Sequence, residues 1–199
     1  MVVNKKDQKS KDTRARILKS ASELFLQGGL PALSVRAIAN RAGLSTIGIY
    51  SHFDGKQGIL DTLYIDAFER VALAMDVSKI DASPVHKVIA SAQAYLRVAD
   101  TYPAHYRLIF GEADEGYQPS AAAAEVAQRA FSLLIEGAGS LLATDASLSQ
   151  KQKLALEIWA IVHGYVGLKN HQLSKSVAGV DWNLLAISAL ETHLSNLVK

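Results

Sequence analysis

Residues 34–56 of this chain read SVRAIANRAGLSTIGIYSHFDGK. Ser34 is of the type that caps helix N-termini, because its hydroxyl can accept a hydrogen bond from a free backbone N–H. The apolar residues that follow recur at helical spacing: Val35, Ile38, Ala39 and Ala42. Gly43 then supplies the backbone freedom that a sharp reversal needs, and Ser45 can cap a second helix. The stretch therefore predicts two short helices joined by a tight turn.

The second of these helices is short and carries small polar side chains. Its apolar residues recur three apart: Leu44, Ile47 and Tyr50. Three of its residues point elsewhere and are small or polar: Thr46, Gly48 and Ser51. Small polar side chains on such a helix can reach base edges in a major groove. The pattern predicts a helix-turn-helix.

The same stretch resembles the DNA-binding motif of the tetracycline-repressor (TetR) family, and the resemblance covers about a quarter of the chain. The matching residues are Thr13, Arg16, Ile17, Leu18, Ala21, Leu24, Phe25, Gly28, Ser34, Arg36, Ile38, Ala39, Ala42, Gly43, Ser45, Ile49, Tyr50, His52, Phe53, Lys56 and Leu60. The alternative is a pair of helices with this pattern that serves only for packing. The resemblance implies a sequence-specific DNA-binding protein.

Charge is distributed unevenly along the 199 residues. Residues 1–60 hold ten Lys or Arg and four acidic residues, a net charge of +6, whereas the remainder holds 11 basic and 15 acidic residues, a net charge of −4. A basic N-terminal part followed by a weakly acidic remainder fits a phosphate-binding module joined to a domain with another role. The chain has no cysteine, no apolar run of about 20 residues and a polar N-terminus. We therefore expect a cytoplasmic protein.

The chain is expected to be all-α, with about nine helices and no strand. Each of the four prolines, at positions 31, 84, 103 and 119, stands where an apolar-periodic segment begins, as proline does at a helix start. The helices expected after the motif begin at Asp54 and then span about 84–101, 103–110, 120–143, 149–173 and 181–197. Three parts are predicted: a disordered basic arm over 1–11, a three-helix DNA-binding domain over 12–54, and a larger helical bundle for ligand binding and dimerisation over 55–199.

The resemblance implies roles for individual residues of the motif. Thr46, Ile47 and Gly48 match base-facing positions. Positions that usually touch the DNA backbone are matched by Ser34, Arg36, Tyr50, Ser51, His52 and Lys56, with Ser45 as the cap. Because the recognition helix has no Arg, Lys, Asn or Gln, we expect DNA shape to carry part of the specificity, helped by Arg36 or the lysine arm. Tyr50 and Phe53 are alternatively core aromatics, and His52 a simple surface residue.

A second set of candidate residues lies in the C-terminal part. Trp159, His163 and Gly164 resemble the Trp-His-Gly signature of one subgroup of TetR-family C-terminal domains. Trp159 and His163 are four apart and so share a helix face, either as packed core or as the border of a ligand cavity. Further wall candidates are Tyr95, Tyr106 and Phe110. A mainly apolar or aromatic small molecule is the expected ligand class.

The last helix carries a broad apolar side that a second copy of the chain can cover. Its residues are Trp182, Leu185, Ala186, Ala189, Leu190, His193 and Leu197. A homodimer also places two recognition helices about 34 to 36 Å apart, as successive major grooves require. Because catalytic and metal-binding motifs are missing from the sequence, we expect neither an enzyme nor a cofactor. The sequence predicts a ligand-released repressor; the alternative is a DNA-binding architectural or activator protein without a ligand.

Overall fold

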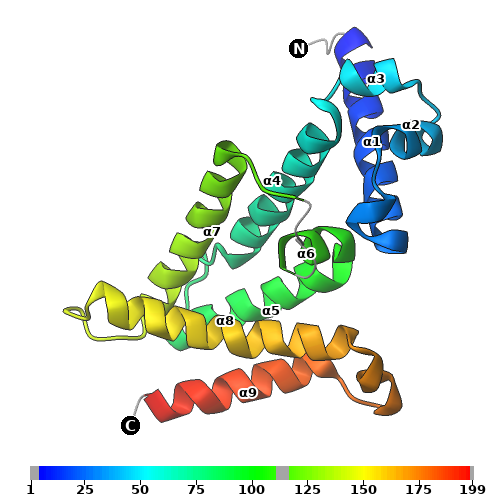
Figure 1. The fold of residues 1–199 in the computed structure, drawn as a ribbon. Coiled ribbons are helices and arrows are strands. Elements are labelled where there is room, and N and C mark those ends of the chain that lie inside the picture. The colour runs from blue at the N-terminus through cyan, green and yellow to red at the C-terminus, as the bar shows by residue number, and fades with distance from the viewer. Residues whose placement is uncertain (1–4, 111–116, 198–199) are drawn as a thin grey trace. The chain divides into compact units, whose positions relative to one another are not determined.

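The computed structural model describes residues 5–110 and 117–197, and over these ranges the chain is entirely helical, without strands (Figure 1). This confirms the all-α prediction. The α-helices are α1 (Lys5–Gly28), α2 (Val35–Ala42), α3 (Thr46–Tyr50), α4 (Gly55–Met75), α5 (Pro84–Thr101), α6 (Pro103–Phe110), α7 (Ala121–Gly139), α8 (Leu148–Asn170) and α9 (Trp182–Leu197). Two short 3-10 helices are η1 (Leu30–Ala32) and η2 (Gln172–Ser176). Within the described ranges, no helix is both long and apolar enough to cross a lipid bilayer.

The chain divides into two compact units. The motif unit contains the described residues up to Phe68 and from Tyr102 to Ala127, and the C-terminal unit contains Glu69–Thr101 and the described residues from Gln128 onward. Helices α4 and α7 each contribute residues to both units. The division therefore does not coincide with the domain boundary that the sequence suggests after residue 54.

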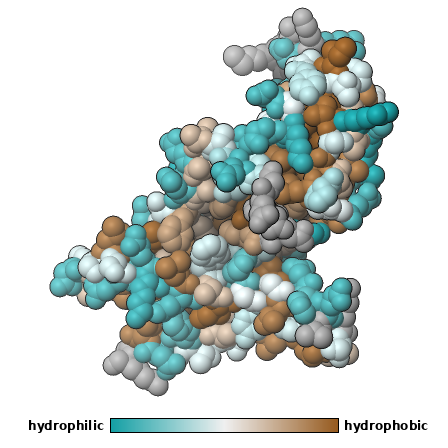
Figure 2. All heavy atoms as spheres, viewed as in Figure 1, coloured by the Kyte–Doolittle hydropathy of each residue, from teal (hydrophilic) through white to brown (hydrophobic). Residues whose placement is uncertain are grey.

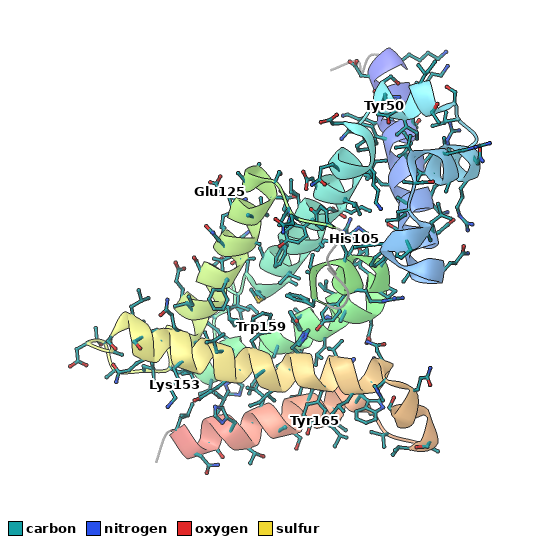
Figure 3. All side chains as sticks on the ribbon, in the orientation of Figure 1. Tyr50, His105, Glu125, Lys153, Trp159 and Tyr165 are labelled. Carbon is teal, nitrogen blue, oxygen red and sulfur yellow. The ribbon has the colours of Figure 1, made fainter. Side chains whose placement is uncertain are left out.

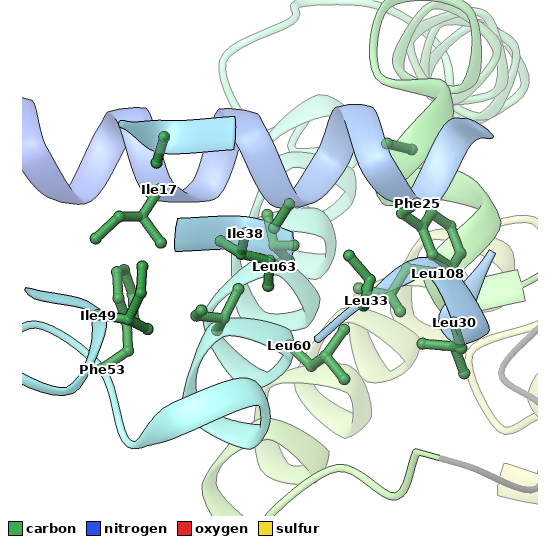
Figure 4. Close-up of a cluster of buried hydrophobic side chains, with 14 of the residues drawn as sticks. Ile17, Phe25, Leu30, Leu33, Ile38, Ile49, Phe53, Leu60, Leu63 and Leu108 are labelled. Atoms are coloured by element: carbon green, nitrogen blue, oxygen red, sulfur yellow. The ribbon is translucent and has the colours of Figure 1, made fainter. Parts of the chain in front are cut away.

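The core of the motif unit is made by residues from α1, α2, α3, α4 and α6 (Figure 4). Its fully buried large side chains are Ile17, Ile38, Ile49, Ile59, Leu60 and Leu108. Each of these helices contributes at least one of them, so burial of apolar area holds the short motif helices in place. The recognition helix is therefore fixed by a core much larger than itself.

Helix α1 begins at Lys5, earlier than residue 12, where the predicted DNA-binding domain begins. The disordered arm expected over 1–11 is thus wrong for residues 5–11, and residues 1–4 lie outside the described part. Residues 5–11 contain no Gly or Pro, and Lys, Gln and Ser are tolerated in helices. The extension is also supported locally, since Gln8 Nε2 donates to Asp12 Oδ1 at 2.9 Å and Thr13 Oγ1 to the Lys9 carbonyl at 2.9 Å.

The C-terminal unit is built around α5, α8 and α9. Its buried side chains on α8 and α9 recur at helical spacing: Leu154, Ile158, Val162, Val166, Ala186, Leu190 and Leu194. At one end, Lys169 Nζ lies 2.5 Å from Asp100 Oδ1, and Asn183 Nδ2 donates to Asp100 Oδ2 at 2.8 Å, which joins all three helices. Burial alone would raise the pKa of Asp100, but the hydrogen bonds from Lys169 and Asn183 outweigh it and lower the pKa.

Two helix ends differ from the sequence prediction. Helix α7 ends at Gly139 instead of residue 143, after Gly137 and Gly139 weaken its last turn. Helix α8 begins at Leu148, where Ser147 and Gln150 form a reciprocal capping box, and ends at Asn170, because His171 adopts an extended backbone. A helix end that is set by backbone geometry is harder to predict from sequence than a helix start that is set by a capping side chain.

Candidate nucleic-acid interface

The turn between α2 and α3 has the geometry that its sequence suggests. Ser34 Oγ accepts a hydrogen bond from the Ala37 N–H at 3.1 Å and so caps α2. Gly43 lies in the left-handed region, at φ 63° and ψ 41°, and its N–H bonds back to α2 carbonyls. A residue with a Cβ is strained in this conformation, whereas glycine is not. The reversal thus follows from one serine and one glycine.

Helix α3 is a single short turn with one buried side chain. Ser45 Oγ accepts from the Gly48 N–H at 3.1 Å and caps the helix. Ile49 is fully buried, whereas Ile47 is 79% exposed and Tyr50 is 61% exposed. Of the apolar row of positions 44, 47 and 50, only Leu44 packs against the core, where it is partly buried. Because Ile49 alone anchors this turn in the core, the side chains around it face outward.

The structure separates Tyr50 from Phe53. Phe53 is only 7% exposed and joins the core, as its alternative reading suggests, whereas Tyr50 lies at the surface (Figure 3). Gly55, at φ 59°, lies against the Tyr50 ring, and a Cβ on it would stand 3.2 Å from Tyr50 Cε1. The absence of a side chain at Gly55 thus leaves room for the ring beside the start of α4.

The other predicted DNA-contacting residues fall into two groups. Those with exposed side chains are Ser34, Arg36, Ser45, Thr46 and Ser51. Gly48, His52 and Lys56 are partly buried. Lys56 Nζ donates to the Leu30 carbonyl at 3.2 Å, so it also ties the start of α4 to η1. The predicted residues therefore surround α3, and their contacts with DNA remain a prediction.

Sequence reasoning missed one residue at this surface, Arg14 of α1. Its Nη1 donates to the main-chain carbonyl of His52, and its guanidinium carbon lies 4.1 Å from the centroid of the Phe53 ring. A signal was available, because Arg14 precedes Ile17 by three residues and Ala21 by seven. An arginine on the core-facing stripe of a helix indicates a specific partner.

The C-terminal unit brings together three of the five predicted ligand residues. Trp159 Nε1 donates to Tyr95 Oη at 3.2 Å, and Tyr95 Oη lies 3.3 Å from His163 Nδ1 (Trp159 is labelled in Figure 3). Phe131 of α7 stacks at a tilt on Trp159, with ring centroids 6.1 Å apart. Burial lowers the pKa of His163, which favours a neutral imidazole. With Nδ1 as acceptor, the tyrosine hydroxyl donates to the histidine and accepts from the indole.

The other two predicted ligand residues belong to the motif unit. The Tyr106 and Phe110 rings of α6 lie 5.0 Å apart, and Phe110 meets Phe68 edge-on at 5.7 Å. They form an aromatic cluster within their own unit. A ligand site that includes all five residues remains a prediction.

Two histidines of the described ranges each lie beside a carboxylate. His105 Nε2 lies 3.0 Å from Asp66 Oδ2, and His193 Nε2 lies 3.2 Å from Glu157 Oε2. Among the residues of those ranges, no group of three or more His, Cys, Asp or Glu side chains is placed to hold a metal ion. These pairs join helices within one unit: α4 with α6, and α8 with α9.

Two family models match the chain. The model described as "Bacterial regulatory proteins, tetR family" matches residues 17–63, and the model described as "Tetracyclin repressor-like, C-terminal domain" matches residues 88–177. The first match spans α2 and α3 completely, together with the C-terminal half of α1. The second includes Trp159 and His163, although it does not test the Trp-His-Gly subgroup.

Curated relatives are transcriptional regulators by name. HTH-type transcriptional regulator Rv1816 of Mycobacterium tuberculosis is 29% identical over 146 residues, 71% of this chain and 62% of that protein, so the match spans less than two thirds of that relative. Uncharacterized HTH-type transcriptional regulator TtgW of Pseudomonas putida is 30% identical over 115 residues, 50% of this chain and 86% of TtgW. HTH-type transcriptional repressor KstR2 of Rhodococcus jostii is 40% identical over 50 residues, 25% of this chain and 24% of KstR2.

Solved structures share the fold along most of the chain. A protein with unknown function from Rhodococcus sp. RHA1 matches with a TM-score of 0.76 at 22% identity, over 94% of this chain and 96% of that one. The TetR family transcriptional regulator PfmR from Thermus thermophilus matches with a TM-score of 0.72 at 16% identity, over 90% and 97%. At these identities the likeness establishes the fold alone.

Proposed function

Because the chain belongs to the TetR family of helix-turn-helix transcriptional regulators, which are not enzymes, we propose that it is a repressor that binds an inverted-repeat operator as a homodimer. The proposal includes release from the operator by a small, mainly apolar molecule. The observation that carries it is the outward face of α3: Thr46 and Ile47 are exposed beside the buried anchor Ile49. The relative KstR2 is named a transcriptional repressor, which supports the choice of repression.

Base reading is assigned to Thr46 and Ile47. The apolar side chain of Ile47 is 79% exposed to water in the free protein. It can pack on a thymine methyl group at a base edge. Thr46 can donate or accept a hydrogen bond at a base edge. Neither residue makes a bidentate pair, so each contact contributes modestly and DNA shape carries the remainder of the specificity.

Phosphate contacts are assigned to the residues that surround α3. Exposed Arg36, the Tyr50 hydroxyl and the Ser51 hydroxyl are of the types that bind backbone phosphates. The N-terminal turns of α1 add three exposed lysines in helical form: Lys5, Lys9 and Lys11. Phosphate binding by these residues accounts for the net positive charge of residues 1–60.

Dimerisation is assigned to α8 and α9. Exposed leucines lie on both helices: Leu156, Leu168, Leu184 and Leu185. Apolar residues lie among polar ones along these helices in Figure 2. Gly164 and Gly167 are also in α8, and a Cβ at either would meet no atom within 4 Å, so folding of the single chain does not require glycine there. Glycines beside exposed leucines permit close approach of a second helix pair.

The dimer face on α9 is narrower than the sequence suggests. Ala186 and Leu190 are buried within their own unit, whereas Leu185 and Leu197 remain exposed. The apolar side of α9 therefore has two roles. Its buried residues pack against the chain itself, and its exposed residues can contact a second copy.

Effector binding is assigned to the neighbourhood of Tyr95, Trp159 and His163. This cluster is aromatic and linked by hydrogen bonds, and it carries no formal charge when His163 is neutral. Such surroundings suit an apolar or aromatic molecule with few polar groups. Helix α4 contributes residues to both units, so it can transmit an effector-dependent change. A coupling of about 1 to 3 kcal/mol changes operator affinity about 5- to 150-fold.

Selection from a random pool of duplexes tests the proposal. We expect an inverted repeat to be recovered, and light scattering to give a dimer at micromolar concentration. A thermal melt against apolar and aromatic compounds should reveal a stabilising ligand, because a ligand that binds only the folded state raises the melting temperature. Asymmetric recovered sites, or a persistent monomer that binds a palindrome tightly, would contradict the dimeric repressor.

A further inference from the structure

The core-facing stripe of α1 ends at an arginine. Phe25, Ala21 and Ile17 are buried along this stripe, at successive spacings of four residues. Arg14, three residues before Ile17, continues the stripe by one more turn and is partly buried. A charged side chain at such a position is costly unless its donors are used.

Two contacts use the Arg14 guanidinium, and both are made with the segment that directly follows α3. Nη1 donates to the His52 carbonyl, and the guanidinium lies over the Phe53 ring with its carbon 4.1 Å from the centroid. The His52 N–H bonds in turn to the Ile49 carbonyl at 3.0 Å, and the Phe53 N–H to the same carbonyl at 2.9 Å. The guanidinium thus binds the chain just where it leaves the recognition helix.

A helix as short as α3 needs such contacts. Five residues are far below the length at which a helix is stable alone, so its orientation depends on what holds its ends. Ser45 caps the first end, and a cation near the last carbonyls complements the second end. Arginine can donate to a carbonyl while its flat face lies on an aromatic ring, which the compact ammonium of lysine does not reproduce.

We propose that Arg14 is a positioning residue that locks the C-terminal end of the recognition helix onto α1. Its charge serves the His52 carbonyl and the Phe53 ring and is not a phosphate contact. The role in DNA recognition rests on the proposed function, whereas the lock itself is a property of the free protein.

The lock is tested first without DNA, by hydrogen exchange of the full chain. In Arg14→Lys, amides of residues 49–53 should exchange about tenfold faster than in the wild type, while amides of α5 and α9 keep their rates. Arg16→Lys is the matched control, because Arg16 is exposed on the same helix. Unchanged exchange over residues 49–53 in Arg14→Lys would overturn the lock.

The second test measures binding to the selected duplex as a function of salt. Arg14→Gln should weaken specific binding about 10- to 100-fold, weaken nonspecific binding much less, and leave the slope of log affinity against log salt unchanged. Arg14→Lys should not restore affinity. A slope shallower by about one counterion, or full rescue by lysine, would identify a phosphate contact and overturn the proposal. If the wild type binds no duplex, the proposed function fails, and the exchange experiment still judges the lock.

Discussion

The two candidate sites of this protein, the helix-turn-helix and the cluster at Trp159, are built in different ways. In the motif unit, α2 and α3 are set by bonds between residues three apart, such as Ser34 with Ala37 and Ser45 with Gly48. In the C-terminal unit, the cluster at Trp159 depends on Tyr95, which lies 64 positions earlier in the sequence. A local motif indicates its function in sequence, whereas a cluster assembled by packing shows only its separate members.

The sharpest contrast within the motif unit is between two isoleucines of α3. Ile49→Ala should lower the free energy of unfolding by about 2 to 4 kcal/mol, because it opens a cavity at a fully buried position. Ile47→Ala should leave that free energy within about 0.5 kcal/mol, since its side chain is exposed, yet weaken operator binding about fivefold or more. Denaturant titration and duplex binding measure the two effects. Equal stability losses in both variants would break the distinction.

A second pair compares a glycine of each unit. Gly43→Ala should destabilise the protein by about 1 to 2 kcal/mol, because alanine is strained at φ 63° although space is free around it. Gly164→Ala, in the helical backbone of α8, should instead leave the monomer as stable or slightly more stable and weaken dimerisation. Thermal melts and sedimentation at several concentrations test both. Weaker folding without weaker dimerisation in Gly164→Ala would remove the support for the interface.

A third comparison concerns two lysines. Lys56→Ala should weaken binding about evenly across DNA sequences and flatten its salt dependence by about one counterion. Lys153→Ala, at an exposed position on α8, should change neither quantity. Salt titrations of duplex binding decide this. A change in the preferred sequence of Lys56→Ala would show that Lys56 reads bases.

The smallest expected effect is a pH dependence in the C-terminal unit. Burial lowers the pKa of His163 below its usual 6.5, so the unfolded chain binds a proton at a higher pH than the folded chain. Stability should therefore fall as pH drops below about 6.5, until the folded histidine is also protonated. Melting curves at about pH 5 and about pH 7 should show this decrease, and His163→Gln should reduce it. If His163→Gln loses as much stability as the wild type over this pH range, groups other than His163 cause the loss.

Local chemistry made the motif predictable. Ser34, Gly43 and Ser45 each fix one feature of backbone geometry, and the prolines at 84 and 103 stand at the first residues of α5 and α6. The family resemblance added residue roles that spacing alone does not give. The sequence therefore predicted the all-α fold and the helix-turn-helix, and both are confirmed.

Features that depend on packing were harder to predict. Spacing suggested a row of positions 44, 47 and 50, but only contact with the core shows that Ile49 is the anchor. The Arg14 contact with His52 joins residues 38 apart, so the stripe of α1 indicates that Arg14 has a partner but does not identify that partner. The early start of α1 at Lys5 was missed because a charged segment reads equally well as a solvated helix or as a disordered arm.

Directed cleavage of DNA tests the role of α3 most directly, because the chain has no cysteine of its own. Thr46→Cys, coupled to an iron chelate that cuts nearby DNA, should cut the selected duplex in two symmetric clusters about one helical turn apart, or a multiple of one turn. Ser132→Cys, at an exposed position of α7, is the control and should give no cuts. Cuts from Ser132→Cys, or none from Thr46→Cys on a duplex that the labelled protein still binds, would contradict recognition of DNA by α3.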